Sequence, residues 1–168
     1  MSVSIVQLDP HTLAALAAGD LAAARRTSPV DLSPWLAGPE CVGTWQRRSR
    51  QVVETPADRA WVTGVLWDDD AEVPVGKAGF HAAPDTNGMV EVGYAVDPAL
   101  RRRGYARAAL ENLIARARRE PDVAVLRVTV SPTNAASLAL IQQYSFLEVG
   151  EQWDDEDGLE IIYEMPVD

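Results

Sequence analysis

Three consecutive arginines followed by a glycine form the stretch of the sequence with the clearest chemical potential, Arg101-Arg102-Arg103-Gly104. An alternating run ends just before it at Val96, and a run with helical spacing begins just after it at Tyr105. A loop that leads into a helix presents unpaired backbone N–H groups and a partial positive charge, so it suits an anion such as a pyrophosphate. Gly104 lets the backbone approach such a ligand, Ala106 leaves room for it, and guanidinium groups bind phosphate oxygens. The plainer alternative is a solvated helix start, which composition alone favours.

Other phosphate-binding and metal-binding signatures are absent from the sequence. There is no G-x-G-x-x-G and no G-K-[ST], which disfavours an unrelated nucleotide-binding α/β domain. The single cysteine, Cys41, excludes a disulfide within the chain and leaves no cysteine cluster for zinc, so we expect no metal.

Glu91 is the candidate general base. It alternates with two very small residues, Gly93 and Ala95, on one face of a predicted strand, which suggests open space around the carboxylate. A base in such a space can deprotonate an ammonium through one water. A strand glutamate that faces solvent or pairs with an arginine is an equally good interpretation. His81, at the end of the preceding strand, could face a substrate cleft, although a surface histidine is the commoner case.

Apolar periodicity and turn residues predict the elements that hold these residues. The helix that starts at Tyr105 has its apolar residues on one face and ends before Pro121. A continuous apolar run indicates a following strand buried on both sides, and Asn87-Gly88 suits a hairpin turn. The predicted strands are 3–7, 60–67, 73–81, 88–96, 123–130, 147–153 and 159–164, and the predicted helices are 9–26, 40–53, 105–120 and 134–144.

This order of elements predicts one α/β domain over residues 1–168. No linker divides the chain, and its 168 residues suit a single core. The strands should form a mixed sheet in one layer with helices on both faces.

The arginine-rich stretch resembles the [RQ]-x-x-G-x-[GA] signature of the GNAT superfamily of N-acetyltransferases, with Arg101, Gly104 and Ala106 at the matching positions. Three further features follow the family's order: Val96-Asp97-Pro98 before the loop, Asn134-Ala135-Ala136-Ser137 like the family's N-x-x-S, and Phe146. The resemblance runs from about Trp61 to Met165. The run Glu91–Tyr94 looks most like the branch of ribosomal-protein N-terminal acetyltransferases.

The resemblance implies a GNAT-like fold, with a mostly antiparallel sheet of about seven strands, and acetyl-CoA as co-substrate. The backbone of Ala95 and Val96 would pair with the pantetheine arm, and Asn134 would hydrogen-bond near it. Ser137 would protonate the leaving thiolate, although a serine near a helix start is often a cap. The pyrophosphate would be held by the loop, residues Arg101, Arg102, Arg103, Gly104, Tyr105 and Ala106.

The resemblance also implies direct attack of a deprotonated amine on the thioester, with an acetyl group moved onto a primary amine. Many members carry a tyrosine acid seven residues after the asparagine, where this chain has Ile141. That difference favours an alternative, a non-catalytic acyl-CoA-binding or sensing module on the same fold. The acceptor stays open among protein N-termini, polyamines, amino acids and antibiotics.

Bulk properties limit the partners. A formal net charge of −10 argues against nucleic acid, because phosphate would be repelled over most of the surface. No run of about 18 apolar residues and no export signal are visible, so we expect a cytoplasmic protein that does not enter a membrane. A homodimer is left open.

Overall fold

The structure is a computed structural model and describes residues 1–167. The chain forms two compact units. Unit 1 comprises residues 1–83 and 93–113, and unit 2 comprises residues 84–92 and 114–168, of which 168 lies outside the described residues.

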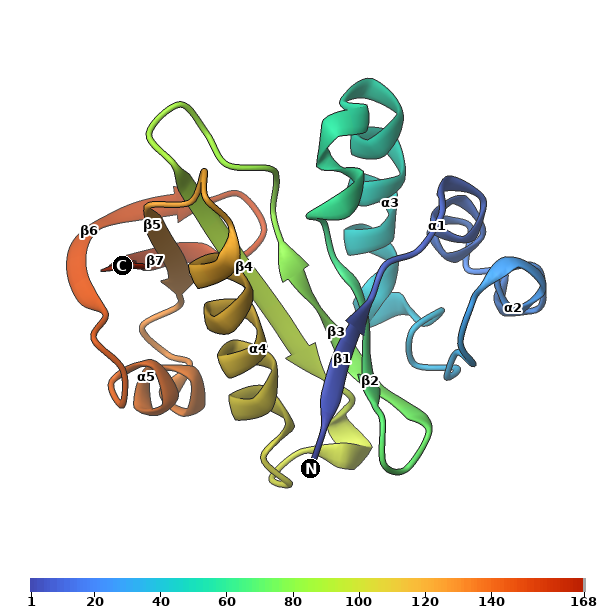
Figure 1. Ribbon diagram of the computed structural model, residues 1–168. Coiled ribbons are helices and arrows are strands. Elements are labelled where there is room, and N and C mark those ends of the chain that lie inside the picture. The colour runs from blue at the N-terminus through green and yellow to red at the C-terminus, as the bar shows by residue number, and fades with distance from the viewer. Residues whose placement is uncertain (168) are drawn as a thin grey trace. The chain divides into compact units, whose positions relative to one another are not determined.

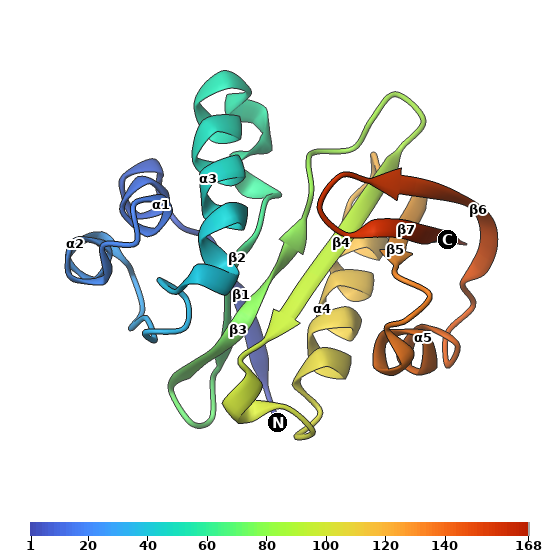
Figure 2. The same ribbon diagram turned by 180° about the vertical axis from the view of Figure 1, so that it is seen from behind.

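Unit 1 contains the first part of the chain (Figure 1). Strands β1, β2 and β3 lie side by side in antiparallel pairing, and α3 lies beside them with α1 and α2 next to it, as both ribbon views show (Figures 1 and 2). A cluster of apolar side chains, with Leu13, Leu16, Leu36, Trp45 and Val65 fully or almost fully buried, forms its core. The elements that lie wholly in this unit are β1 (Val3–Val6), α1 (Pro10–Ala17), α2 (Leu21–Thr27), α3 (Pro39–Glu54), η1 (Pro56–Ala60), β2 (Gly64–Asp68), β3 (Val73–Phe80) and η2 (Pro98–Leu100).

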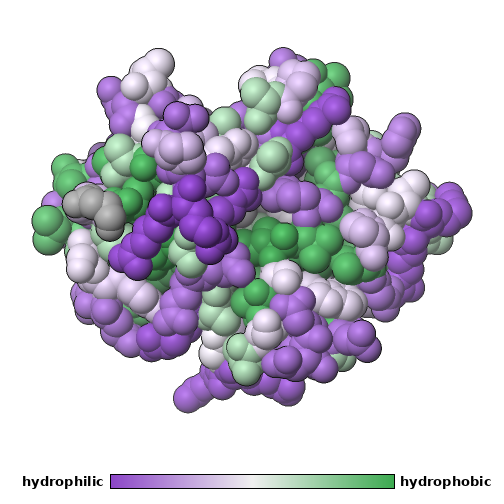
Figure 3. All heavy atoms as spheres, viewed as in Figure 1, coloured by the Kyte–Doolittle hydropathy of each residue, from purple (hydrophilic) through white to green (hydrophobic). Residues whose placement is uncertain are grey.

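Unit 2 contains an antiparallel group of strands, in which β7 pairs with both β5 and β6. Leu126 of β5 lies opposite Met165 of β7, and both are buried. Strand β6 is exposed along nearly its whole length, and Figure 3 shows hydrophobic residues at the surface over it, where Leu147 and Val149 are exposed. The elements wholly in this unit are β5 (Val125–Val130), α5 (Ala135–Ile141), β6 (Leu147–Asp154) and β7 (Gly158–Pro166).

Two elements run through both units, β4 (Met89–Val96) and α4 (Tyr105–Arg119). Across residues 1–167 the strands form one seven-stranded sheet in the order β1-β2-β3-β4-β5-β7-β6. Most of its pairs are antiparallel, and β4 with β5 is parallel. The expected mixed, mostly antiparallel sheet of about seven strands is therefore confirmed.

The prediction of one helix over residues 9–26 is wrong, because the chain forms α1 and α2 with a break between them. Gly19 adopts a left-handed backbone with φ of +70°, a conformation that ends helices. The side chain of Asp20 then accepts a hydrogen bond from the Ala23 N–H at 2.9 Å and begins α2 as its N-cap.

Strand β5 is not buried on both sides, contrary to the expectation from its apolar run. Leu126, Val128 and Val130 are buried, whereas Val125, Arg127 and Thr129 between them are only half-buried. On the half-buried face, Arg127 bonds Glu164 and Thr129 bonds Glu91. The strand therefore shows the alternation of a strand buried on one side.

The turn before β4 contains the expected Asn-Gly pair, Asn87-Gly88. Gly88 has φ of +73°, but Asn87 does not adopt the positive φ that a type I′ turn requires at both central residues. Asp85 organises the turn instead, since its carboxylate accepts the N–H groups of Asn87 and Met89 at 2.8 and 3.0 Å. These N–H groups lower the pKa of Asp85.

Candidate functional site

The arginine-rich loop lies between η2 and α4, as its sequence predicts. Arg101, Arg102, Arg103 and Gly104 are exposed, and Tyr105 begins the helix. Arg102 and Gly104 both adopt left-handed backbone conformations, with φ of +62° and +89°. A non-glycine residue rarely takes this conformation, and such strain is often found at ligand-binding loops. The Ala108 N–H donates one turn back to the Gly104 carbonyl at 3.0 Å.

A buried pair that the sequence did not reveal anchors this helix start. The Tyr105 hydroxyl donates to Asp68 Oδ2 at 2.6 Å, and Asp68 lies at the end of β2. Its other oxygen, Oδ1, accepts the N–H groups of Asp70 and Ala71, each at 2.9 Å. These hydrogen bonds, with that from Tyr105 first, lower the pKa of Asp68, and the same contact raises the pKa of Tyr105. Asp68 therefore holds the end of the arginine-rich loop as an anion.

The residues before the loop differ in where their backbone groups point. A Cβ at Gly76 of β3 would clash with the carbonyl oxygen of Ala95, so that carbonyl is directed at β3. The carbonyl of Val96 accepts a hydrogen bond from Arg101 Nε at 3.4 Å. Of the two residues expected to pair with a pantetheine arm, Val96 thus has its carbonyl within reach of an exposed arginine, and Ala95 has its carbonyl turned toward the neighbouring strand.

Glu91, the candidate base, lies in unit 2 on the part of β4 that pairs with β5. It is half-buried, and its Oε1 accepts a hydrogen bond from the Thr129 hydroxyl at 2.9 Å. Its register partner on β5 is Arg127, which forms an ion pair with Glu164 at 2.6 Å. Arg127 is thus bound to Glu164, and the Thr129 hydroxyl helps to orient the Glu91 carboxylate.

Asn134 and Ser137 meet at the start of α5. The Asn134 side chain accepts the Ser137 N–H at 3.1 Å and caps the helix, so the capping residue is the asparagine. Asn134 is exposed, and Ser137 is half-buried. Ile141, where many relatives carry the tyrosine acid, is fully buried and serves the core.

Several other residues of unit 1 have structural roles. Trp45 is fully buried and donates to the Leu36 carbonyl at 2.7 Å. Cys41 is buried, and burial raises the pKa of its thiol to about 11, so the thiolate is disfavoured. Burial lowers the pKa of Lys77, whose ammonium donates to the Thr44 hydroxyl at 2.5 Å.

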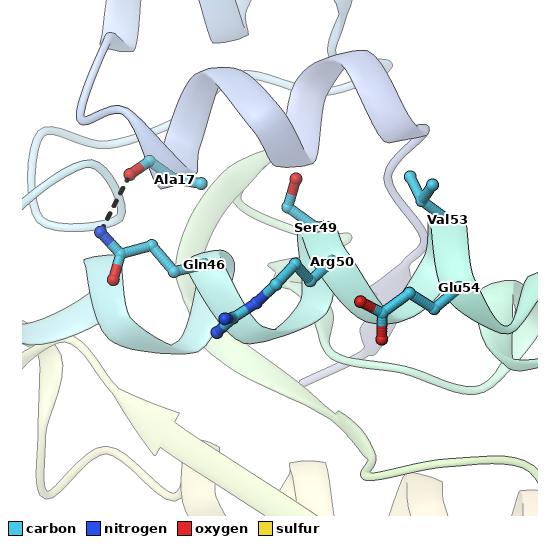
Figure 4. A pocket seen from close by; sticks show the side chains of 6 residues that line it. All are labelled: Ala17, Gln46, Ser49, Arg50, Val53 and Glu54. Atoms are coloured by element: carbon cyan, nitrogen blue, oxygen red, sulfur yellow. Dashed lines mark hydrogen bonds between the residues drawn. The ribbon is translucent and has the colours of Figure 1, made fainter.

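A shallow hollow on unit 1 contains none of the predicted site residues. It measures about 560 Å³ and lies along the exposed side of α3. Figure 4 shows the Gln46 amide turned to the Ala17 carbonyl, at 3.5 Å. The hollow is lined by Ala17, Gln46, Ser49, Arg50, Val53 and Glu54.

Neither a metal-binding cluster nor a membrane-spanning helix occurs in the part of the chain that the structure describes. No group of three or more His, Cys, Asp or Glu side chains in residues 1–167 is placed to hold a metal ion. Within the same residues, every helix is too short or too polar to cross a bilayer.

Comparison with solved structures shows where this fold occurs. The structure of RimL, an alpha-N-protein acetyltransferase of a ribosomal protein, in complex with coenzyme A, aligns with a TM-score of 0.67 at 16% identity, covering 100% of this chain and 96% of that one. A dodecameric spermidine N-acetyltransferase from Vibrio cholerae aligns with a TM-score of 0.65 at 11% identity, covering 99% and 94%. At these identities the alignments show a shared fold.

Comparison of sequences identifies a family in addition to the fold. YjdG of Bacillus subtilis (strain 168), described as an uncharacterized N-acetyltransferase, is 31% identical over 88 residues. That match covers 52% of this chain and 51% of YjdG, so the chain spans about half the length of the curated relative that it matches. The model of the acetyltransferase (GNAT) family matches residues 27–146, which include the arginine-rich loop, Glu91, Asn134 and Ser137. With its fold, its loop and a family match over most of its length in agreement, the chain belongs to the acetyltransferase (GNAT) family.

Proposed function

We propose that the protein is an acetyl-CoA-dependent N-acetyltransferase that moves an acetyl group onto a primary amine by direct attack. The observation that carries the proposal is the loop before α4, with exposed arginines and left-handed backbone at Arg102 and Gly104. The same proposal treats residues 1–168 as one N-acetyltransferase domain.

The chemistry of the loop fits the pyrophosphate of coenzyme A. The N–H groups at the start of α4 and the positive end of its dipole attract an anion. A Cβ at Gly104 would have only one atom within 4 Å, the Met1 Cε at 3.8 Å, so the space in front of the glycine is open. The residues proposed to bind coenzyme A are Ala95, Val96, Arg101, Arg102, Arg103, Gly104, Tyr105, Ala106 and Asn134, and bound acetyl-CoA would supply the thioester.

The proton transfers are assigned to Glu91 and Ser137. Glu91 would take the proton of the acceptor ammonium through one water, with its carboxylate oriented by Thr129. Ser137 is half-buried, and its hydroxyl would give a proton to the departing thiolate, while its backbone N–H is held by Asn134. No acyl-enzyme is needed in this scheme.

A cationic acceptor is favoured by the charge of the protein. The net charge of −10 raises the local concentration of cationic amines and steers them toward the surface. The two solved relatives act on a ribosomal protein and on spermidine by their descriptions. We therefore include both a small polyamine and a protein N-terminus in the proposed acceptor class.

One observation supports a second candidate function, a non-catalytic acyl-CoA-binding or sensing module. Ile141 is fully buried, so no side chain at that position reaches a bound thioester. In that case the phosphate loop would bind the coenzyme, and no acceptor would be modified.

An acceptor screen separates the two candidates. Thiol release from acetyl-CoA would be measured with spermidine, an aminoglycoside, free amino acids and peptides with free N-termini. We expect release with at least one amine. Tight binding of acetyl-CoA without release above the hydrolysis background for any acceptor would favour the sensing module.

Glu91→Gln tests the assigned base. Turnover should fall roughly a hundredfold while acetyl-CoA affinity stays nearly unchanged, because only proton removal is lost. The loss should shrink at high pH, where the amine is already neutral. Glu148→Gln on the exposed strand β6 is the matched control and should behave like the wild type. Coincident pH–rate profiles for wild type and Glu91→Gln would reduce Glu91 to a strand residue.

A further inference from the structure

His81 follows directly after β3, and its backbone is held by α3. The His81 carbonyl accepts hydrogen bonds from Gln51 Nε2 at 2.7 Å and from Arg48 Nη1 at 3.3 Å. Arg48 also donates to the Gln51 amide oxygen at 2.8 Å, so the two donors brace each other. A loop residue with its carbonyl held twice from one helix has little freedom to move.

A buried carboxylate extends this support. Asp58 of η1, which is almost completely buried, accepts the Gln51 amide at 2.7 Å and the Ala83 N–H at 3.0 Å. The backbone is thus held at His81 and two residues later. Two charged groups take part in these hydrogen bonds, the Arg48 guanidinium on α3 and the Asp58 carboxylate on η1.

The His81 side chain lies over Gly93 on β4. A Cβ added at Gly93 would be 2.9 Å from the imidazole Nε2 and 3.5 Å from Cδ2, with no other atom within 4 Å. A separation of 2.9 Å is too short for a carbon contact, so the missing side chain at Gly93 is what makes room for the ring. The half-buried imidazole therefore sits on the strand two residues before Ala95.

We propose that His81 is a catalytic residue that takes a proton from the acceptor amine at Nε2. The inference rests on the proposed function and adds a second proton acceptor to Glu91. A neutral imidazole ordinarily titrates near neutral pH, which makes it an efficient base under those conditions. Glu91 takes one proton of the ammonium through water, and the freed electron pair of the nitrogen attacks the thioester carbonyl carbon. As the new C–N bond forms, a second N–H bond of that nitrogen breaks and its proton moves to Nε2. The C–S bond then breaks, and the thiolate takes the proton of the Ser137 hydroxyl, which regains a proton from water.

The first test uses the two histidines of the chain. His81→Ala should lower turnover roughly a hundredfold, because a general base typically contributes that much or more, with acetyl-CoA affinity unchanged. Imidazole added to the buffer should restore part of the lost turnover in His81→Ala, since the truncation leaves space for it. His11→Ala, at an exposed histidine in the first turn of α1, is the control and should keep wild-type turnover without a response to imidazole.

The second test uses the contact with Gly93. Gly93→Ala should displace the imidazole and lower turnover at least tenfold, while the hydrogen bonds to the His81 carbonyl keep the loop in place. In the His81→Ala background the same change should have almost no further effect, because the ring it displaces is gone. A purely structural role for Gly93 would give the same loss in both backgrounds and would overturn the proposal.

The outcomes separate this inference from the proposed function. If the wild-type protein turns over an amine and His81→Ala turns it over equally fast, the role of His81 is overturned and the proposed function stands. Absence of turnover by the wild-type protein with every amine overturns both. His81→Gln repeats the first test if His81→Ala fails to fold by circular dichroism, and it should lose turnover without rescue by imidazole.

Discussion

At the scale of single residues, Arg102 is where backbone strain and predicted ligand binding coincide. Its φ of +62° is a conformation that costs a non-glycine residue roughly 1 kcal/mol or more. The protein keeps an arginine there although glycine would be less strained. A phosphate contact by the guanidinium would explain that choice.

Replacing Arg102 by glycine and by alanine separates strain from binding. Arg102→Gly should unfold in urea with a free energy about 1 kcal/mol higher than Arg102→Ala, because glycine tolerates the positive φ. Both variants should bind coenzyme A more weakly than the wild type in titration calorimetry, since both lose the guanidinium. Wild-type affinity in both variants would exclude a phosphate contact by Arg102.

At the scale of elements, the start of α4 depends on a contact with the end of β2. Tyr105→Phe removes the hydroxyl that donates to Asp68 and leaves a buried carboxylate with one donor fewer. The melting temperature should fall by roughly 2–4 °C, and coenzyme A affinity should fall with it as the loop loses its anchor. An unchanged melting temperature and affinity would show that the loop is held in another way.

The lowered pKa of Asp68 predicts how stability depends on pH. A carboxyl whose folded pKa lies below its unfolded value stabilises the protein above the unfolded value of about 3.9 and loses that effect as pH falls through the folded pKa. Asp68→Asn should therefore lose less melting temperature than the wild type between pH 6 and the acid range. If the melting temperatures of the two proteins fall by the same amount over that pH range, the stabilising role of the Asp68 carboxylate is contradicted.

The cap of α5 allows another separation of roles. Asn134→Ala should destabilise the protein by about 1 kcal/mol, whereas Asn134→Asp keeps an oxygen that accepts the Ser137 N–H. If the Asn134 amide also donates to coenzyme A, both variants lose affinity in titration calorimetry. Loss of affinity in Asn134→Ala alone would mean that Asn134 acts only by shaping the helix start.

At the scale of the whole molecule, charge is distributed unevenly along the chain. Residues 147–167 contain no Lys, Arg or His, and their carboxylates are Glu148, Glu151, Asp154, Asp155, Glu156, Asp157, Glu160 and Glu164. The arginines of residues 101–103 have the opposite charge. An anionic coenzyme would be attracted by these arginines and repelled by the acidic segment.

Acetyl-CoA should stabilise the whole chain by mass action. At a hundred times its dissociation constant it adds about 2.7 kcal/mol, which corresponds to a rise in melting temperature of roughly 5–10 °C for a protein of this size. NADH and ATP at the same concentration should raise it much less. Gly104→Val should abolish the shift, because its branched side chain enters the open space at a backbone with φ of +89°. A shift that survives in Gly104→Val would place the coenzyme elsewhere.

The sequence by itself determined the order of most elements and the position of the arginine-rich loop. Both depend on local properties: apolar periodicity over a few turns, and the freedom of Gly104 to take a positive φ. The break at Gly19 was also encoded locally, by a glycine followed by an N-cap aspartate, but the apolar spacing on either side masked it.

Only the tertiary structure decided which side chains meet. Tyr105 and Asp68 are 37 residues apart, and Glu91 and Thr129 are 38 apart. The placement of His81 over Gly93 likewise depends on the register of two strands. A shift of one residue in register turns every side chain of a strand to the other face, so such pairs cannot be derived from composition or spacing. The family resemblance and the arginine-rich loop were therefore visible in the sequence, whereas the Asp68 anchor of the loop, the Thr129 partner of Glu91 and the placement of His81 over Gly93 required the fold.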